Sequence, residues 1–223
     1  MRKILMIGLA ASFVLSSVSA QKKKVPVTDK EKISYCIGVN LGQNFAMQGI
    51  DVDPNMLLLG IKDILSKKSP AMTDQDMQTT MMNFQKSLIT KAGEKNKKEG
   101  EAFLEANKNK ADVVTLPSGL QYKVISMGNG PKPTATQTVK CNYRGMLVNG
   151  KEFDNSYKRG TPAELPLDHV IKGWADGIQL MPTGSKWEFY IPSDLAYGEQ
   201  GEPRGGIGPN SVLIFEVELL EIK

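Results

Sequence analysis

The chain has 223 residues, of which 40% are hydrophobic, 23% are charged and 7% are aromatic. This is the composition of a globular protein, and it excludes disordered, collagen-like and multi-span membrane proteins. The length favours one large domain or two small ones. Lys and Arg number 28 against 24 Asp and Glu, and so small an excess of positive charge predicts no nucleic acid among the partners.

The first segment, residues 1–20, reads MRKILMIGLAASFVLSSVSA. Two cations precede a short apolar run, and Val18 and Ala20 stand at the minus-three and minus-one positions of a cut before Gln21, which is the pattern of a secretory signal peptide. A retained anchor helix is the alternative, but the run is shorter than the roughly 20 apolar residues that such a helix needs. No cysteine follows the run, so we expect a periplasmic or secreted protein that is not a lipoprotein.

Two short helices are predicted next. Thr28 and Glu31 form the capping-box pattern that opens a helix. Asp53 and Pro54 combine an N-cap with a first-turn proline, so a second, shorter helix is expected after them. The first of these helices carries apolar residues at every fourth position, as expected for one amphipathic face: Ile33, Ile37, Leu41 and Phe45.

A third helix is predicted to begin at Thr73, which repeats the capping pattern with Asp76. Its apolar stripe fades into the charge-rich stretch 91–110, in which Gly93 and Gly100 weaken a continuous helix. This stretch is expected to be either a long, solvated connecting helix or a hinge. The stripe consists of Met77, Met81, Phe84 and Leu88.

These helices cannot bury their apolar faces on one another within a single chain. A second copy would cover the remaining apolar surface, so we expect a homodimer formed through residues 28–90. Gly38 and Gly42, four residues apart, would let a second backbone approach, although two merely tolerated glycines are an equal alternative. Six of the eleven methionines also lie here; methionine-rich surfaces adapt to varied partners, while ordinary core filling is the other explanation.

From residue 112 onward the apolar period changes from helical to alternating. Strands are predicted at 120–124, 139–144, 186–191 and 215–219, and the dipeptide Asn149–Gly150 is a strong hairpin signal. Only residues 170–181 have the pattern of a short helix. We therefore expect an α+β domain over 112–223, with an antiparallel sheet wrapped around one short helix, preceded by an all-α dimerisation domain over 21–111. In the third strand, Trp187, Phe189 and Ile191 alternate with Lys186, Glu188 and Tyr190.

Several kinds of chemistry are excluded by the residues present. The two cysteines, Cys36 and Cys141, are expected to be separate buried thiols, although an exported protein could join them. A single histidine, His169, cannot supply a metal site with them, and its neighbours give no nucleophile triad, so we expect it at a surface or a pocket rim. The glycine-rich segment 197–211 lacks the Gly-Lys-Ser/Thr ending of a phosphate loop. We expect neither metal nor cofactor.

What remains is an excess of aromatic residues beside polar groups, a composition suited to an apolar ligand pocket with few hydrogen bonds. At these residues the sequence resembles the FKBP-type peptidyl-prolyl cis-trans isomerases, which bind rapamycin-like macrolides. The resemblance covers nearly all of residues 115–222, and the helices upstream resemble the dimerisation segment of the macrophage infectivity potentiator-like branch. It is carried by the stretches YRGMLVNGKEFDNS, VIKGWADGIQLMPTGSKWEFYIPSDLAYG, GIGPNSVLIFEVELL and SYCIGVNLGQNFAMQGIDVDP.

The resemblance implies an aromatic pocket for proline with Trp174 as its floor. Plain core packing is the alternative for Trp174 and Phe215. Ile207 corresponds to the apolar residue of an overhanging loop, and Leu165 occupies a neighbouring apolar position. The walls correspond to Tyr143, Phe153, Val170, Ile171 and Phe215.

The resemblance also implies a few polar roles. The backbone N–H of Ile171 and the hydroxyl of Tyr197 correspond to donors that hold substrate or drug carbonyls. Asp154 corresponds to a carboxylate at the pocket rim and Arg159 to a nearby basic residue, a pair that would orient Tyr143. The residues expected to be catalytic are Tyr143, Asp154, Trp174, Tyr197 and Phe215.

Two positions depart from the family pattern. Some members place phenylalanine after a proline where this chain has Ala163, so the pocket wall is expected to be more open. Some members carry a histidine in the overhanging loop where this chain has Glu202. These differences bear on the residues preferred beside proline and on macrolide affinity, and not on the reaction.

The resemblance implies a prolyl isomerase that accelerates rotation about X-Pro bonds during the folding of exported proteins. Its expected partners are proline-containing unfolded or partly folded polypeptides, rapamycin-like macrolides and a second copy of the chain. The alternative is a dimeric holdase chaperone, in which the helical cleft binds unfolded clients and isomerisation is secondary.

Overall fold

The computed structural model describes residues 25–223, so the predicted signal peptide and its cleavage near Ala20 lie outside the described residues. The contacts divide the chain between Ala71 and Met72 into two compact units. The change of period at residue 112 falls between the long helix of the second unit and its first strand.

The first unit contains two helices, α1 (Asp29–Gln48) and α2 (Pro54–Leu65). The capping box is confirmed, because the Thr28 hydroxyl accepts a hydrogen bond from the N–H of Glu31 while the Glu31 carboxylate accepts one from the N–H of Thr28. The N-cap at Asp53 is confirmed as well, since its carboxylate accepts hydrogen bonds from the two N–H groups at the start of α2. Neither helix has a buried residue.

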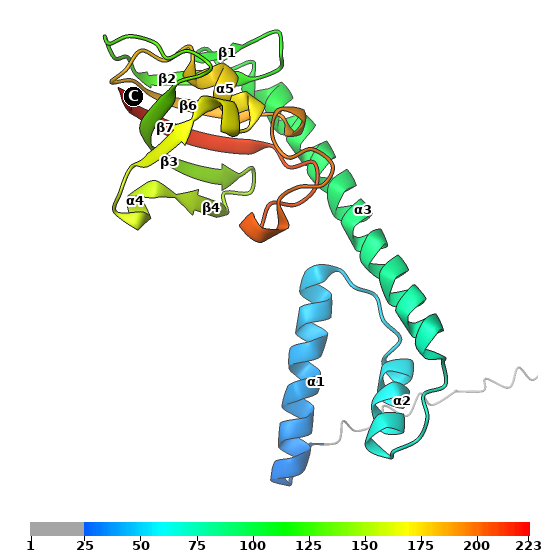
Figure 1. The fold of residues 1–223 in the computed structure, drawn as a ribbon. Coiled ribbons are helices and arrows are strands. Elements are labelled where there is room, and N and C mark those ends of the chain that lie inside the picture. The colour runs from blue at the N-terminus through cyan, green and yellow to red at the C-terminus, as the bar shows by residue number, and fades with distance from the viewer. Residues whose placement is uncertain (1–24) are drawn as a thin grey trace, which may run out of the picture. The chain divides into compact units, whose positions relative to one another are not determined.

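The second unit begins with the long helix α3 (Asp74–Asn107), capped by Thr73 as predicted. The helix is continuous through Gly93 and Gly100, both of which are buried. They are buried because this part of α3 packs against residues 209–212, at the end of the loop that precedes β7 (Figure 1). Of the two alternatives for residues 91–110, a connecting helix or a hinge, the structure shows the helix through Asn107. The two glycines allow close packing and do not form a hinge.

The sheet is antiparallel throughout and has the order β1-β2-β6-β7-β3-β4, with β5 also pairing β3. The longest strands, β3 and β7, lie side by side in its middle. Two short helices, α4 (Ser156–Arg159) and α5 (Lys172–Ile178), follow β4 and β5. The strands are β1 (Val113–Thr115), β2 (Gln121–Ser126), β3 (Thr138–Leu147), β4 (Glu152–Asn155), β5 (Ala163–Pro166), β6 (Lys186–Ile191) and β7 (Leu213–Ile222).

The predicted hairpin at Asn149–Gly150 joins β3 to β4. Gly150 has φ 81°, a left-handed conformation that glycine adopts without strain. The Leu147 N–H donates to the Lys151 carbonyl at 2.9 Å and closes the turn. The hairpin is therefore confirmed.

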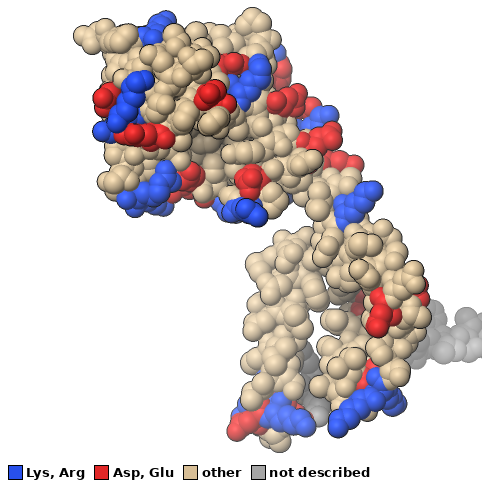
Figure 2. Space-filling view, in the orientation of Figure 1, with Lys and Arg blue, Asp and Glu red and all other residues tan. Residues whose placement is uncertain are grey.

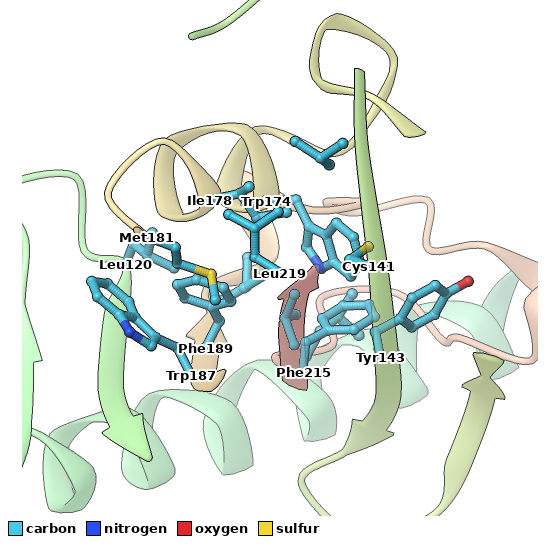
Figure 3. Packing of buried hydrophobic residues seen from close by; sticks show 14 of the residues in the cluster. Leu120, Cys141, Tyr143, Trp174, Ile178, Met181, Trp187, Phe189, Phe215 and Leu219 are labelled. Atoms are coloured by element: carbon cyan, nitrogen blue, oxygen red, sulfur yellow. The ribbon is translucent and has the colours of Figure 1, made fainter. Parts of the chain in front are cut away.

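The core lies between α5 and one face of the sheet. Figure 3 shows Trp174 and Ile178 of α5 pointing toward Phe189 and Leu219 of the strands. Gly177 lets the helix approach, because a Cβ there would lie 2.6 Å from the Phe189 ring. The predicted sheet wrapped around one short helix is confirmed.

The opposite face of the sheet differs from the prediction. The alternation places Tyr190 on the polar face of β6, yet it is only 5% exposed. Phe103 of α3 covers it, with ring centroids 5.9 Å apart. The pattern within β6 misses this because the covering residue comes from a distant part of the chain.

The two cysteines are free, as expected, but only one of them is buried. Burial raises the pKa of the Cys141 thiol in β3 to about 12. The prediction that Cys36 is buried is wrong for the single chain, because within residues 25–223 nothing covers α1 enough to bury any of its residues.

Candidate active site

One pocket of about 390 Å³ gathers nearly all of the predicted site residues. Of these, Arg159 alone does not line it. His169 takes the predicted rim position. Glu202 and Gly205, from the loop after β6, complete the lining. The sequence does not indicate a site role for Gly205, since one glycine in a glycine-rich loop is not distinctive. The predicted residues in the lining are Tyr143, Phe153, Asp154, Leu165, Val170, Ile171, Trp174, Tyr197, Ile207 and Phe215.

Trp174 on α5 is only 4% exposed and touches two further aromatic rings at the base of this pocket. Tyr143 of β3 and Phe215 of β7 both meet the indole edge to face, at centroid distances of 5.0 Å. Edge-to-face contacts set the positive edge of one ring against the negative face of another, so the cluster is rigid and apolar. The indole N–H makes no hydrogen bond within the described part of the chain.

The wall of the pocket depends on a glycine. Phe153 of β4 packs edge to face on Phe215, with centroids 5.4 Å apart. A Cβ at Gly145 would lie 2.7 Å from the Phe153 ring and 2.8 Å from the Phe215 ring. A larger residue at this position in β3 would therefore push the two rings apart.

Three polar residues, Tyr143, Asp154 and Arg159, interact with one another on one side of the ring cluster. The Tyr143 hydroxyl donates to Asp154 Oδ2 at 2.5 Å, and Arg159 Nη2 donates to the same hydroxyl at 2.8 Å. Arg159 also forms an ion pair with Asp154, and its guanidinium lies 5.3 Å from the centre of the Tyr143 ring. Arg159 thus contacts Tyr143 and Asp154, which both line the pocket, but Arg159 itself does not line it.

Burial, together with the hydrogen bond to Asp154, raises the pKa of Tyr143 to about 12. The phenol therefore stays protonated at neutral pH and keeps its donated hydrogen bond. This ring is fixed at both ends, by the indole and by the carboxylate.

Two donors remain uncommitted at the pocket. The Tyr197 side chain is 38% exposed, and its hydroxyl makes no hydrogen bond to any residue that the structure describes. Burial, and then the carboxylates of Glu202 and Asp154, raise the pKa of Tyr197. The backbone N–H of Ile171, just before α5, likewise donates to no group in the described chain. Both donors are available to the carbonyl groups of a ligand.

The loop between β6 and β7 covers one side of the pocket. Glu202 and Ile207 exchange two backbone hydrogen bonds, of 2.9 and 3.0 Å, around a 3-10 turn at Pro203–Gly205. This pairing turns the Ile207 side chain inward, where it is 3% exposed. Within residues 25–223, three or more potential metal ligands do not gather anywhere, and no helix has the length and apolarity to cross a membrane.

Two family models match the chain. The domain amino-terminal to FKBP-type peptidyl-prolyl isomerase matches residues 30–124, and FKBP-type peptidyl-prolyl cis-trans isomerase matches residues 130–220. The outer membrane protein MIP of Legionella longbeachae is 44% identical over 97% of this chain and 94% of its own length. The peptidyl-prolyl cis-trans isomerase Mip of Coxiella burnetii is 44% identical over 88% of each chain.

A solved structure shares the fold as well. The crystal structure of FkpA from Escherichia coli is 36% identical and superposes with a TM-score of 0.67, covering 89% of this chain and 99% of that one. Both the helical region and the sheet domain thus have counterparts in one family. The chain belongs to the FKBP-type peptidyl-prolyl cis-trans isomerases.

Proposed function

We propose that the aromatic pocket is the active site of this isomerase and that it acts on X-Pro bonds of exported polypeptides. One observation carries the proposal: a rigid cluster of aromatic rings lines a cavity of about 390 Å³, and two residues with uncommitted donors, Ile171 and Tyr197, line it as well. Such a cavity accepts an apolar ring and offers hydrogen bonds to the carbonyl groups beside it.

The reaction needs no covalent step. Rotation about an X-Pro bond breaks amide resonance, at a barrier of roughly 18 to 20 kcal/mol, and takes tens to hundreds of seconds unaided. The planar amide has more charge separation than the twisted one, so transfer from water into an apolar pocket disfavours the planar form. Lowering the barrier by about 6 kcal/mol corresponds to a rate increase on the order of 10⁴.

Each site residue has a role in this scheme. Trp174 and Phe215 hold the prolyl ring, and the hydroxyl of Tyr197 with the N–H of Ile171 holds the flanking carbonyls. Asp154 and Arg159 orient Tyr143. The remaining apolar contacts come from Phe153, Leu165, Val170 and Ile207.

The test is a cis-to-trans assay on a short X-Pro peptide, with and without rapamycin, using the chain from residue 21. We expect rapamycin-sensitive acceleration that is lost in Trp174→Ala and reduced about tenfold in Tyr197→Phe, the loss expected for one hydrogen bond made in the transition state. Tyr157→Phe is the matched control, because this exposed tyrosine bonds Glu218 on the sheet and does not line the pocket. Full activity of a folded Trp174→Ala variant would place the reaction elsewhere.

We propose further that the helical region, residues 21–111, pairs two chains and that residues 112–223 form the isomerase domain. The large apolar side chains of α1 and α2 support pairing, because none of them is buried. Residues 33–48 contain no charged side chain, and Figure 2 shows the charges of α1 at one end of the helix. A second copy would cover this surface.

The same apolar surface supports a second candidate, a holdase chaperone, although family membership favours catalysis over it. Trp174→Ala separates the two. Suppression of aggregation of a client without proline should survive this substitution if the helical region acts as a holdase. Export to the periplasm or beyond remains our proposal from the signal-peptide pattern, and proteomic detection of an N-terminus at Gln21 in the exported fraction would test it.

A further inference from the structure

One face of α3 docks on the loop that covers the pocket. Gly93 and Gly100 lie on this face, and a Cβ at Gly100 would be 2.6 Å from the Val212 side chain. A Cβ at Gly93 would be 3.2 Å from Pro209. The helix backbone therefore lies directly against residues 209–212, at the end of the loop.

Asn96 lies between these glycines on the same face and is half-buried. Its side-chain amide donates to the Pro209 carbonyl at 2.8 Å and to the Ser211 hydroxyl at 3.4 Å. In return, the Asn210 amide donates to the Gly93 carbonyl at 3.4 Å. Three hydrogen bonds thus fasten the end of the loop to α3.

The fastened segment is itself bonded to the start of the loop. The Asn210 N–H donates to the Gly198 carbonyl at 2.8 Å, and Gly198 directly follows Tyr197. Asn210 has φ 54°, a left-handed conformation that few side chains adopt and that asparagine tolerates better than most. The two ends of the loop are therefore joined by Asn210, a residue in an uncommon backbone conformation. The side chain of Asn210 is in turn hydrogen-bonded to α3.

We infer that Asn96 is a positioning residue for the isomerase reaction: it fixes the base of the 197–211 loop and thereby the place of Tyr197 and Ile207 at the pocket. The inference rests on the proposed active site. Asn96 does not itself line the active-site pocket. Without the hydrogen bonds of Asn96, Pro209 and Ser211 on either side of Asn210 lose their polar contacts with α3. The base of the loop, and with it Tyr197, is then held less firmly, by the two hydrogen bonds of Asn210.

The experiment combines two measurements on the full chain carrying Asn96→Ala. Hydrogen–deuterium exchange reports the loop through peptides spanning 198–211, and the X-Pro peptide assay reports the reaction. We expect at least fivefold faster exchange in the loop, with a comparable fall in kcat/KM, because the substitution removes two hydrogen bonds and the net loss of one alone corresponds to about fivefold. Exchange in β7 should stay unchanged.

Asn83→Ala is the matched control, since it makes the same substitution at an exposed position of the same helix. Asn96→Asp is a second variant: it keeps the shape, cannot donate to the Pro209 carbonyl, and should behave as Asn96→Ala does. Unchanged loop exchange in both Asn96 variants would overturn the inference, and so would faster exchange with unchanged kcat/KM. If the wild-type chain showed no isomerase activity, the proposed function would fail, while the exchange data would still decide whether Asn96 holds the loop.

Discussion

At the scale of single residues, Tyr143 joins the ring cluster to the charged rim. It packs on the indole of Trp174 and donates its hydroxyl proton to Asp154. The sequence predicts both its wall position and its link to Asp154 and Arg159, because the family pattern has these residues at fixed spacings. The sequence does not predict that Arg159 lies outside the pocket. Residue type and spacing do not show whether a side chain contacts the cavity directly or only through a neighbouring residue.

Because the pKa of Tyr143 is raised, the stability of the fold should depend on pH in the alkaline range. Between pH 10 and about 12 the unfolded chain loses this phenolic proton while the folded chain keeps it, so the free energy of unfolding falls as the pH rises. Tyr143→Phe should make that fall shallower, by at most about 1.4 kcal/mol per pH unit. Urea unfolding at a series of pH values measures it.

Neutral pH provides the control for this prediction. Both states keep the phenolic proton there, so wild type and Tyr143→Phe should have the same dependence of stability on pH. Equal slopes above pH 10 would contradict the raised pKa.

At the scale of elements, the helices of the first unit, their caps, the hairpin and the antiparallel sheet follow from local pattern. Capping boxes and an Asn-Gly turn act over a few residues, so the sequence alone is sufficient for them. The local pattern misses the burial of Tyr190, Gly93 and Gly100, because it depends on contacts of α3 with β6 and with residues 209–212, which come much later in the chain. Pocket residues from β4, α5 and β7 became predictable only through the family resemblance.

The contacts of α3 predict that a boundary at residue 112 weakens the isomerase domain. The Gln121 side chain in β2 is buried, accepts a hydrogen bond from Asn107 and donates one to the Leu104 carbonyl, both at 2.9 Å. A chain of residues 112–223 lacks these partners and the Phe103 ring. We expect it to be less stable than residues 91–223 by about 2 to 4 kcal/mol, from lost aromatic burial and hydrogen bonds.

Urea unfolding of the two shortened chains measures this difference. Both should be monomeric by light scattering, because both lack α1 and α2. Equal free energies of unfolding would show that the end of α3 contributes nothing to the domain.

At the scale of the whole molecule, the exposed apolar surface of α1 predicts the oligomeric state. Ile37 is 56% exposed in the single chain. If a second copy covers it, Ile37→Glu places a charge in that interface, and light scattering should return one chain mass where the unsubstituted chain returns two. Activity on a short peptide should be unchanged, since the pocket lies within one chain.

Ile125→Glu is the matched control for this substitution. Ile125 is 46% exposed and lies on β2, outside the region proposed to pair. The Ile125→Glu variant should still have the mass of two chains by light scattering. One chain mass for the unsubstituted protein would overturn the homodimer.

The order of the strands also has a consequence for when the enzyme is formed. β7 follows every other strand in the sequence, yet it lies in the middle of the sheet between β6 and β3 and carries Phe215 of the pocket. Contacts between segments so distant in sequence form slowly, and the two halves of the sheet stay unjoined until β7 is inserted. During synthesis the isomerase domain therefore remains incomplete until β7 has been made, so the pocket and its activity can form only after the rest of the sheet is already present.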